Sequence, residues 1–113
     1  MTDIQFIKCA RECAAYTDPD AYVSDLSLSD IWGDSPDAEV PASRVADLRA
    51  IWDAVHRPVR DIASSAGLSQ RKLAERFLIP YRTMENWCVG IRECPLYTRL
   101  MMQRILSLLP EIR

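Results

Sequence analysis

Four side chains that can bond to DNA bases or pack against them lie close together in one short segment. They are Tyr81, Arg82, Glu85 and Asn86, between Pro80 and Gly90. Arginine can donate two hydrogen bonds to guanine and asparagine can pair in the same way with adenine, each worth about 1–3 kcal/mol of discrimination between bases. If Met84 and Trp87 face the core of a helix, the four side chains face outward near its N-terminal end. The spacing therefore predicts a helix that can read base edges in the major groove.

A second short helix should precede this one and fix its position. Ser69 is a favourable N-cap residue for a helix that runs to Phe77. Gly67 can end the helix before it in the left-handed conformation, and Pro80 suits the first position of the helix that follows. Ala74 is small enough for the second helix to pack across the first. These residues predict a helix-turn-helix.

The other apolar residues also follow helical spacing, and no segment alternates with a period of two. We expect helices over residues 3–16, 41–56, 59–66 and 95–109, and one or two short helical turns within the acidic residues 20–40. The first helix should end before Pro19. Gly33 and Pro36 break the acidic stretch, whose loop should span residues 33–40. The expected fold class is all-α, with a helical extension on the N-terminal side of the helix-turn-helix.

The segment that contains both motif helices resembles a known family. It reads Gly67-Leu68-Ser69-Gln70-x-x-Leu73-Ala74-Glu75-x-Phe77-x-Ile79-Pro80-x-Arg82-Thr83-x-Glu85-Asn86-Trp87-x-x-Gly90-x-Arg92. This pattern is similar to the lambda-repressor-like helix-turn-helix domain (Cro-type, xenobiotic-response-element type) of bacterial and phage regulators, over about residues 58–109. It departs from that family at Leu78, where a turn glycine is usual, and at Cys88-Val89, where an acidic and a polar residue are usual. The first departure predicts a slightly different turn.

The resemblance implies a lambda-repressor-like bundle and a set of DNA contacts. Base contacts are implied for Tyr81, Arg82 and Asn86, with Glu85 on the same outward face. Phosphate contacts are implied for Gln70, Thr83 and Arg92, and Gln70 also braces the second helix. Further attraction to phosphates, weakened by salt, would come from Arg71, Lys72 and Arg76. The alternative for this face is a solvated surface with helix ion pairs between Arg82 and Glu85 or between Glu85 and Arg92.

The net charge of −2 is the sum of two opposite parts. Residues 1–56 carry four Lys or Arg and eleven Asp or Glu, a net charge of −7, whereas residues 57–113 carry ten and five, a net charge of +5. A basic half favours an anionic partner, which the acidic half should repel. We therefore expect two domains: an acidic helical extension over residues 1–56, packed on the core, and a helix-turn-helix DNA-binding domain over residues 57–113.

The sequence lacks the motifs of an enzyme or of a membrane-spanning protein. It contains no glycine-rich phosphate loop, no His and carboxylate residues at the spacing of metal ligands, and no nucleophile with a nearby base. Cys9, Cys13, Cys88 and Cys94 lack zinc-site spacing and are expected to be free thiols in the core or at its edge, with a Cys-only metal site as the alternative. The single histidine, His56, should compensate a helix C-terminus. We expect a cytoplasmic protein without catalytic residues, metal, cofactor or membrane contact, since neither an export signal nor an apolar run of about 20 residues is present.

Together these features predict a sequence-specific DNA-binding protein that regulates transcription, as a repressor or as an antitoxin-type autoregulator. One recognition helix reads few base pairs, so a homodimer on a palindromic operator is expected. The apolar last helix, residues 96–109 with Met101 and Met102, is the candidate dimer surface. The alternative is a protein-interaction module, in which a helix-turn-helix scaffold without DNA binding presents the acidic half to a partner protein such as a toxin.

Overall fold

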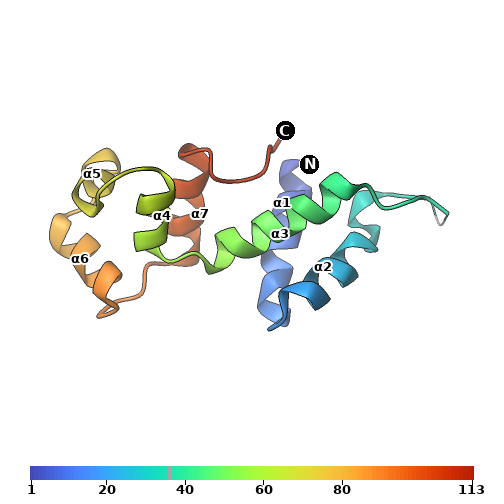
Figure 1. Cartoon of the computed structure of the whole chain (residues 1–113), viewed down its shortest axis with the longest axis horizontal. Coiled ribbons are helices and arrows are strands. Elements are labelled where there is room, and N and C mark those ends of the chain that lie inside the picture. Colours follow the sequence, from blue (N-terminus) through green and yellow to red (C-terminus); the bar gives the residue numbers. More distant parts are fainter. Residues whose placement is uncertain (36) are drawn as a thin grey trace. The chain divides into compact units, whose positions relative to one another are not determined.

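The computed structural model describes residues 1–35 and 37–113, and these residues form helices and loops without a strand. Figure 1 shows the order of the helices along the chain. The all-α fold class is confirmed, whereas Pro36, at which the sequence predicts a break, lies outside the described residues. The chain divides into two compact units, residues 1–55 with 109–113 and residues 56–108. We call them the acidic unit and the basic unit, because they carry net charges of −7 and +5.

The acidic unit contains two short helices and nearly all of a longer one. They are α1 (Asp3–Glu12), α2 (Pro19–Ser27) and α3 (Ala42–His56), with 3-10 turns at Cys13–Ala15 and Asp30–Trp32. A capping box starts α1: the Thr2 hydroxyl accepts a hydrogen bond from the Gln5 amide at 3.1 Å, and Gln5 Oε1 accepts one from the Thr2 amide at 2.9 Å. These bonds satisfy two backbone donors that a helix start leaves without partners.

Residues 19–27 form a nine-residue helix, where the sequence predicts only one or two short turns. The Asp18 carboxylate accepts hydrogen bonds from the Asp20 and Ala21 amides at 3.3 and 3.2 Å. Pro19 lies in the first turn, where its missing N–H costs nothing. The Asp-Pro pair that ends the first helical segment therefore also starts the second.

The core of the acidic unit forms around Tyr22, which is fully buried. Its hydroxyl donates a hydrogen bond to the Cys9 carbonyl at 2.7 Å, and its ring lies 5.3 Å from the ring of Trp52. Burial raises the pKa of the Cys9 thiol to about 11 and also raises the pKa of the Cys13 thiol. The expectation that these cysteines are free thiols in the core is confirmed, and they pack there as small apolar residues.

The buried face of α1 consists of one aromatic residue and two small residues. Phe6, Cys9 and Ala10 are buried, whereas Ile4 and Ile7 are exposed. Residues 6, 9, 10 and 13 follow the 3.6-residue helical period and therefore lie on one face of the helix. The larger Phe6 ring takes the core position, which an apolar pattern alone does not distinguish from its neighbours.

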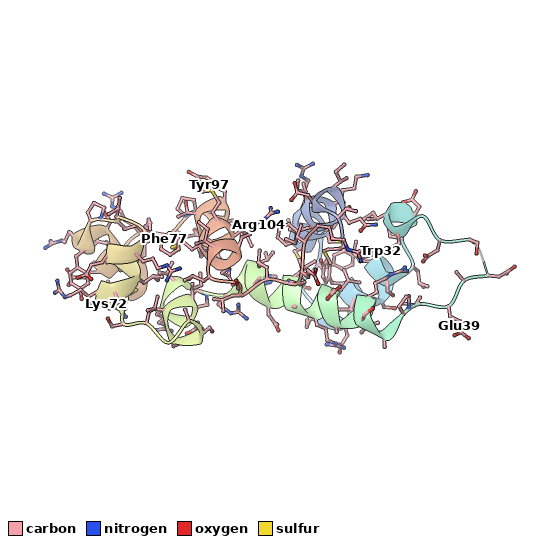
Figure 2. The ribbon with its side chains drawn as sticks, turned by 90° about the horizontal axis from the view of Figure 1, so that it is seen from above. Trp32, Glu39, Lys72, Phe77, Tyr97 and Arg104 are labelled. Atoms are coloured by element: carbon pink, nitrogen blue, oxygen red, sulfur yellow. The ribbon has the colours of Figure 1, made fainter. Side chains whose placement is uncertain are left out.

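Arg44 joins three segments of the acidic unit. Its guanidinium pairs with both carboxylate oxygens of Asp34, with Nη2 to Oδ1 at 3.0 Å, and donates from Nη1 to the Ser27 carbonyl at 3.0 Å. It also lies 4.7 Å from the ring centroid of Trp32. The Arg44 side chain is only 9% exposed, so these contacts replace nearly all of its hydration. Figure 2 shows Trp32 among the helices of this unit and Glu39 out on the following loop.

Replacing Arg44 with alanine should lower the free energy of unfolding by about 2 kcal/mol, because the Ser27 carbonyl and the Asp34 carboxylate lose a charged donor. Thermal unfolding followed by circular dichroism measures this loss. The matched variant Arg44→Lys keeps the charge but not the two-pronged geometry, and should recover only part of it. Equal stability of wild type and Arg44→Ala would contradict the described contacts.

The same contact makes the effect of Arg44 depend on pH. The Arg44 guanidinium holds the pKa of Asp34 below its ordinary value of 3.8 in the folded state. A carboxyl with a lowered folded pKa adds stability at pH values above its unfolded pKa and loses that contribution as the pH falls through the folded pKa. The difference between wild type and Arg44→Ala should therefore be constant above about pH 5 and shrink below about pH 4.

The C-terminal residues belong to the acidic unit. The Arg113 amide donates a hydrogen bond to the Met1 carbonyl at 3.0 Å, and residues 109–113 cluster with residues 1–55. The sequence analysis assigns these residues instead to the second domain.

The predicted last helix, residues 95–109, is too long. In the structure α7 (Leu96–Ile105) ends before Ser107, which adopts a positive φ of 60°, and the Leu108 amide donates a hydrogen bond back to the Gln103 carbonyl at 2.8 Å.

The basic unit contains four helices that follow one another closely. They are α4 (Val59–Ser65), α5 (Gln70–Arg76), α6 (Tyr81–Val89) and α7. Their shared core consists of the buried residues Val59, Ile62, Ala63, Leu73, Ala74, Met84, Cys94 and Met102. All four helices contribute residues to this core, and Cys94 contributes from the loop between α6 and α7. The core therefore packs the motif helices α5 and α6 together with α4 and α7.

A buried glutamine joins the start of the basic unit to its last helix. Gln103 is fully buried, and its Oε1 atom accepts a hydrogen bond from Arg57 Nη1 at 2.7 Å. Arg99 Nη1 donates to the Arg57 carbonyl at 2.9 Å. The residue at which the chain enters the basic unit is thus fixed to α7 by two hydrogen bonds. Sequence spacing gave no indication of this contact, which joins residues 46 positions apart.

Candidate nucleic-acid interface

The first motif helix, α5, begins where the sequence predicts, directly after Ser69. Gly67 adopts a left-handed φ of 70° after α4, and the Ser69 hydroxyl accepts a hydrogen bond from the Lys72 amide at 3.1 Å. The N-terminal turn of α5 carries Gln70, Arg71 and Lys72, of which Gln70 is half-buried and the two cations are exposed. Lys72 Nζ lies 3.4 Å from a Glu75 carboxylate oxygen, and the side chain extends from α5 into solvent in Figure 2.

The turn between α5 and α6 forms with a leucine in the left-handed conformation. Leu78 has a φ of 55° and is 90% exposed. This conformation costs an L-residue about 1–2 kcal/mol, which is why glycine is favoured there. The Ile79 amide compensates by bonding to the Ala74 carbonyl at 2.9 Å, and Ala74 is buried where the helices meet. The departure at Leu78 therefore leaves the turn closed and places an apolar side chain in solvent.

The second motif helix has one buried and one open face. Met84 is fully buried, whereas Arg82 and Glu85 are exposed and Tyr81 and Asn86 are half-buried. At about 100° per residue, Arg82, Glu85 and Asn86 lie within about 100° of arc on the side of α6 away from Met84, and Tyr81 lies at the edge of this face. Pro80 precedes the helix as its N-cap and is not its first residue, since α6 begins at Tyr81. The structure therefore brings the four candidate base-contacting residues to one face.

The Tyr81 ring is held from two sides. The Arg71 guanidinium carbon lies 4.1 Å from the ring centroid, and the ring also packs against the core of the basic unit. A guanidinium over an aromatic face gains cation–π attraction and keeps its N–H groups free to donate at its edges. This contact joins a candidate phosphate ligand on α5 to a candidate base contact on α6. Sequence reasoning missed it because the two residues lie on different helices.

The remaining candidates lie around the same helix. Thr83 is half-buried, and Arg92 is exposed in the loop after Gly90, which ends α6 with a φ of 84°. The Asn86 carbonyl accepts hydrogen bonds from the Ile91 and Arg92 amides at 3.0 and 3.3 Å, which fixes this loop against the helix end. Within residues 37–113, Glu85 forms no ion pair with Arg82 or Arg92, so the helix ion pairs considered as an alternative are not formed.

Positive charge is concentrated on this unit. It carries nine arginines and lysines against four acidic residues. Among them, Arg71, Lys72, Arg76, Arg82 and Arg92 are exposed on or beside the motif helices. Such a surface attracts polyanions through the release of condensed counterions.

Comparison with known proteins finds no family model, no curated protein and no solved structure that matches the chain. In the part of the chain that the structure describes, no three His, Cys, Asp or Glu side chains are placed to hold a metal ion. The described helices include none with the length and apolarity to cross a membrane.

Proposed function

We propose that this chain is a sequence-specific DNA-binding protein of the lambda-repressor-like class that regulates transcription, as a repressor or an antitoxin-type autoregulator. The observation that carries the proposal is the open face of α6, where Tyr81, Arg82, Glu85 and Asn86 lie together at the N-terminal two-thirds of a helix anchored by Met84. A major groove about 12 Å wide admits one α-helix. A short helix whose polar face is opposite its buried anchor has the form that this docking requires.

Each residue of this face has a definite task in the complex. Arg82 donates two hydrogen bonds to guanine, Asn86 pairs with adenine, and the Glu85 carboxylate accepts from the N4 amino group of cytosine. Tyr81, held under Arg71, packs against the bases or sugars at the edge of the site. Gln70, Arg71, Lys72, Thr83 and Arg92 bond to phosphates on either side of the groove and set the orientation of α6.

Lys72 provides a test of the proposed phosphate contacts, because its side chain is 69% exposed. Lys72→Ala should weaken binding to all DNA sequences by a similar factor and reduce the slope of log affinity against log salt by about 0.9, the value for one phosphate contact. Fluorescence anisotropy with labelled duplexes over a salt series measures the slope. The matched variant Lys8→Ala, at an exposed position of α1 in the acidic unit, should leave it unchanged. A slope unaffected by Lys72→Ala would remove this residue from the interface.

We also propose that the protein binds as a homodimer through α7. Tyr97, Met101 and Ile105 are 69%, 56% and 61% exposed and recur every four residues, so they form one apolar stripe along the helix. Tyr97 is labelled at one end of α7 in Figure 2. Two antiparallel copies of this stripe would bury it with Met101 at the two-fold axis. Met102, which the sequence adds to this surface, is instead in the core.

Met101→Glu should therefore yield monomers and lower affinity for a palindromic site at least about tenfold, because each monomer keeps only one half-site. Sedimentation velocity and anisotropy on the same samples measure both effects. Ser65→Glu, which adds the same charge at an exposed position of α4, is the control. A wild-type chain that stays monomeric on DNA would contradict the dimer while leaving the proposed reading face intact.

A further inference from the structure

A pocket of the basic unit lies beside the partly exposed indole of Trp87. One hollow of about 350 Å³ is lined by His56, Pro58, Val59, Trp87, Gly90, Arg92, Glu93, Cys94 and Arg99. A second hollow of about 270 Å³ shares Pro58, Trp87 and Gly90 with it and adds Arg60, Cys88 and Val89. Trp87 therefore borders both hollows. A single hollow of this size is in the range that holds small organic ligands.

The lining of the first hollow combines an aromatic wall with an excess of positive charge. Pro58, Val59 and Trp87 provide apolar surface, and the Lys, Arg, Asp and Glu residues of the lining are two arginines, Arg92 and Arg99, and one acid, Glu93. Arg99 is half-buried and held by its hydrogen bond to the Arg57 carbonyl at 2.9 Å, so its guanidinium is fixed at the site before a ligand arrives. Preorganised donors lose little entropy when a ligand binds.

This combination selects for one chemical class of ligand. An aromatic ring gains stacking against the indole, and a carboxylate gains charge-assisted, two-pronged hydrogen bonds from an arginine. A cation would be repelled by the two arginines, and a purely apolar ligand would displace water from the Arg92 guanidinium without replacing its hydrogen bonds. We propose that this pocket binds a small aromatic carboxylate of one or two rings, with its ring on Trp87 and its carboxylate on Arg92 and Arg99.

Binding there would also regulate the reading helix, a consequence that rests on the proposed DNA-binding function. Trp87 belongs to α6, and Arg92 is a candidate phosphate contact. A carboxylate that occupies the Arg92 guanidinium removes it from the DNA backbone. By linkage, the ligand lowers the affinity for DNA by the same factor as DNA lowers the affinity for the ligand. The pocket would then be an effector site.

The test uses the full chain without DNA and a small panel of probes: benzoate, salicylate and indole-3-acetate. Titration is followed by the indole N–H signals in nuclear magnetic resonance spectra. Trp87 is in the basic unit and Trp32 and Trp52 are in the acidic unit, so the last two are internal controls. At least one probe should shift the Trp87 signal saturably at sub-millimolar to low millimolar concentration. For indole-3-acetate, the neutral analogue tryptophol and the cationic analogue tryptamine should bind at least tenfold more weakly.

Arg92→Gln should weaken binding of a probe that shifts the Trp87 signal, the active probe, about tenfold. The control Arg76→Gln, at an exposed position of α5 outside the pocket, should not weaken it. The proposal is overturned if no probe shifts the Trp87 signal saturably, if the neutral analogue binds as well as the acid, or if the two arginine variants behave alike.

A final titration adds operator DNA. The active probe should weaken DNA binding severalfold in the wild type and not in Arg92→Gln. A chain that binds the probe but no DNA would refute the proposed DNA-binding function but not the binding of an aromatic carboxylate in the pocket.

Discussion

The double variant Arg82→Ala/Asn86→Ala is expected to lose its preference for one DNA sequence while remaining folded. In the proposed complex, each side chain makes a two-pronged base contact worth about 1–3 kcal/mol, so removing both should cost roughly a thousandfold in affinity for the preferred site. Binding to unrelated DNA should change by much less, since the proposed phosphate contacts are retained and do not depend on sequence. Both positions lie outside the core of the basic unit, so the fold should not be affected.

Affinities of the double variant for the preferred duplex and for a scrambled duplex give its specificity ratio. Arg76→Ala removes one exposed charge from α5 without removing a proposed base contact, and should keep most of that ratio. Circular dichroism and the Trp87 indole signal verify that the variants are folded. Unchanged selectivity in the double variant would favour the alternative of a protein-interaction module whose acidic unit binds a basic partner.

Ala74→Leu is expected to disrupt the basic unit selectively. Ala74 is 2% exposed and lies where α5 meets the turn to α6, and its carbonyl accepts the Ile79 amide at 2.9 Å. Three extra carbons have no space there, and overpacking of this kind costs about 1–3 kcal/mol. Because Met84 packs into the same core, the strain should also displace α6 and abolish specific DNA binding.

The three tryptophans locate this damage. In Ala74→Leu, the Trp87 indole signal should broaden or shift, whereas the Trp32 and Trp52 signals of the acidic unit should remain. Ala46→Leu, at an exposed position of α3, is the matched control and should change the stability by no more than about 0.5 kcal/mol. Equal effects of the two substitutions would mean that a small residue is not required between the motif helices.

Local chemistry predicted the ends of the helices well where one residue decides them. Ser69 and Gly67 bond and turn as their types imply, because an N-cap hydroxyl and a left-handed glycine act within a few residues. The sequence predicts short helical turns in place of the nine-residue α2, because the apolar residues there are sparse. The Asp18-Pro19 pair indicates the end of the preceding helix but also forms the start of α2. The last helix was predicted too long because Leu106, Leu108 and Leu109 continue the apolar pattern beyond the turn that closes α7.

The candidate site was predictable as a set of residues but not as an arrangement. Helical periodicity places Arg82, Glu85 and Asn86 on one face, since that requires only α6 to be a helix. The stacking of Arg71 on Tyr81 joins two helices, and the bond from Arg57 to Gln103 joins residues far apart in the chain. Such contacts depend on how helices pack, which a single sequence does not encode locally. For the same reason, the division of charge was visible from the sequence, but the return of residues 109–113 to the acidic unit was not.

In vitro selection shows whether the open face of α6 reads a DNA sequence, as we propose. The full wild-type chain is mixed with a random duplex library, and bound DNA is sequenced after several rounds at a low and a physiological salt concentration. We expect one short motif, repeated with two-fold symmetry, to be enriched at both concentrations and more sharply at the higher one, where unspecific phosphate binding weakens. A library that stays random at both salt concentrations would contradict this proposal.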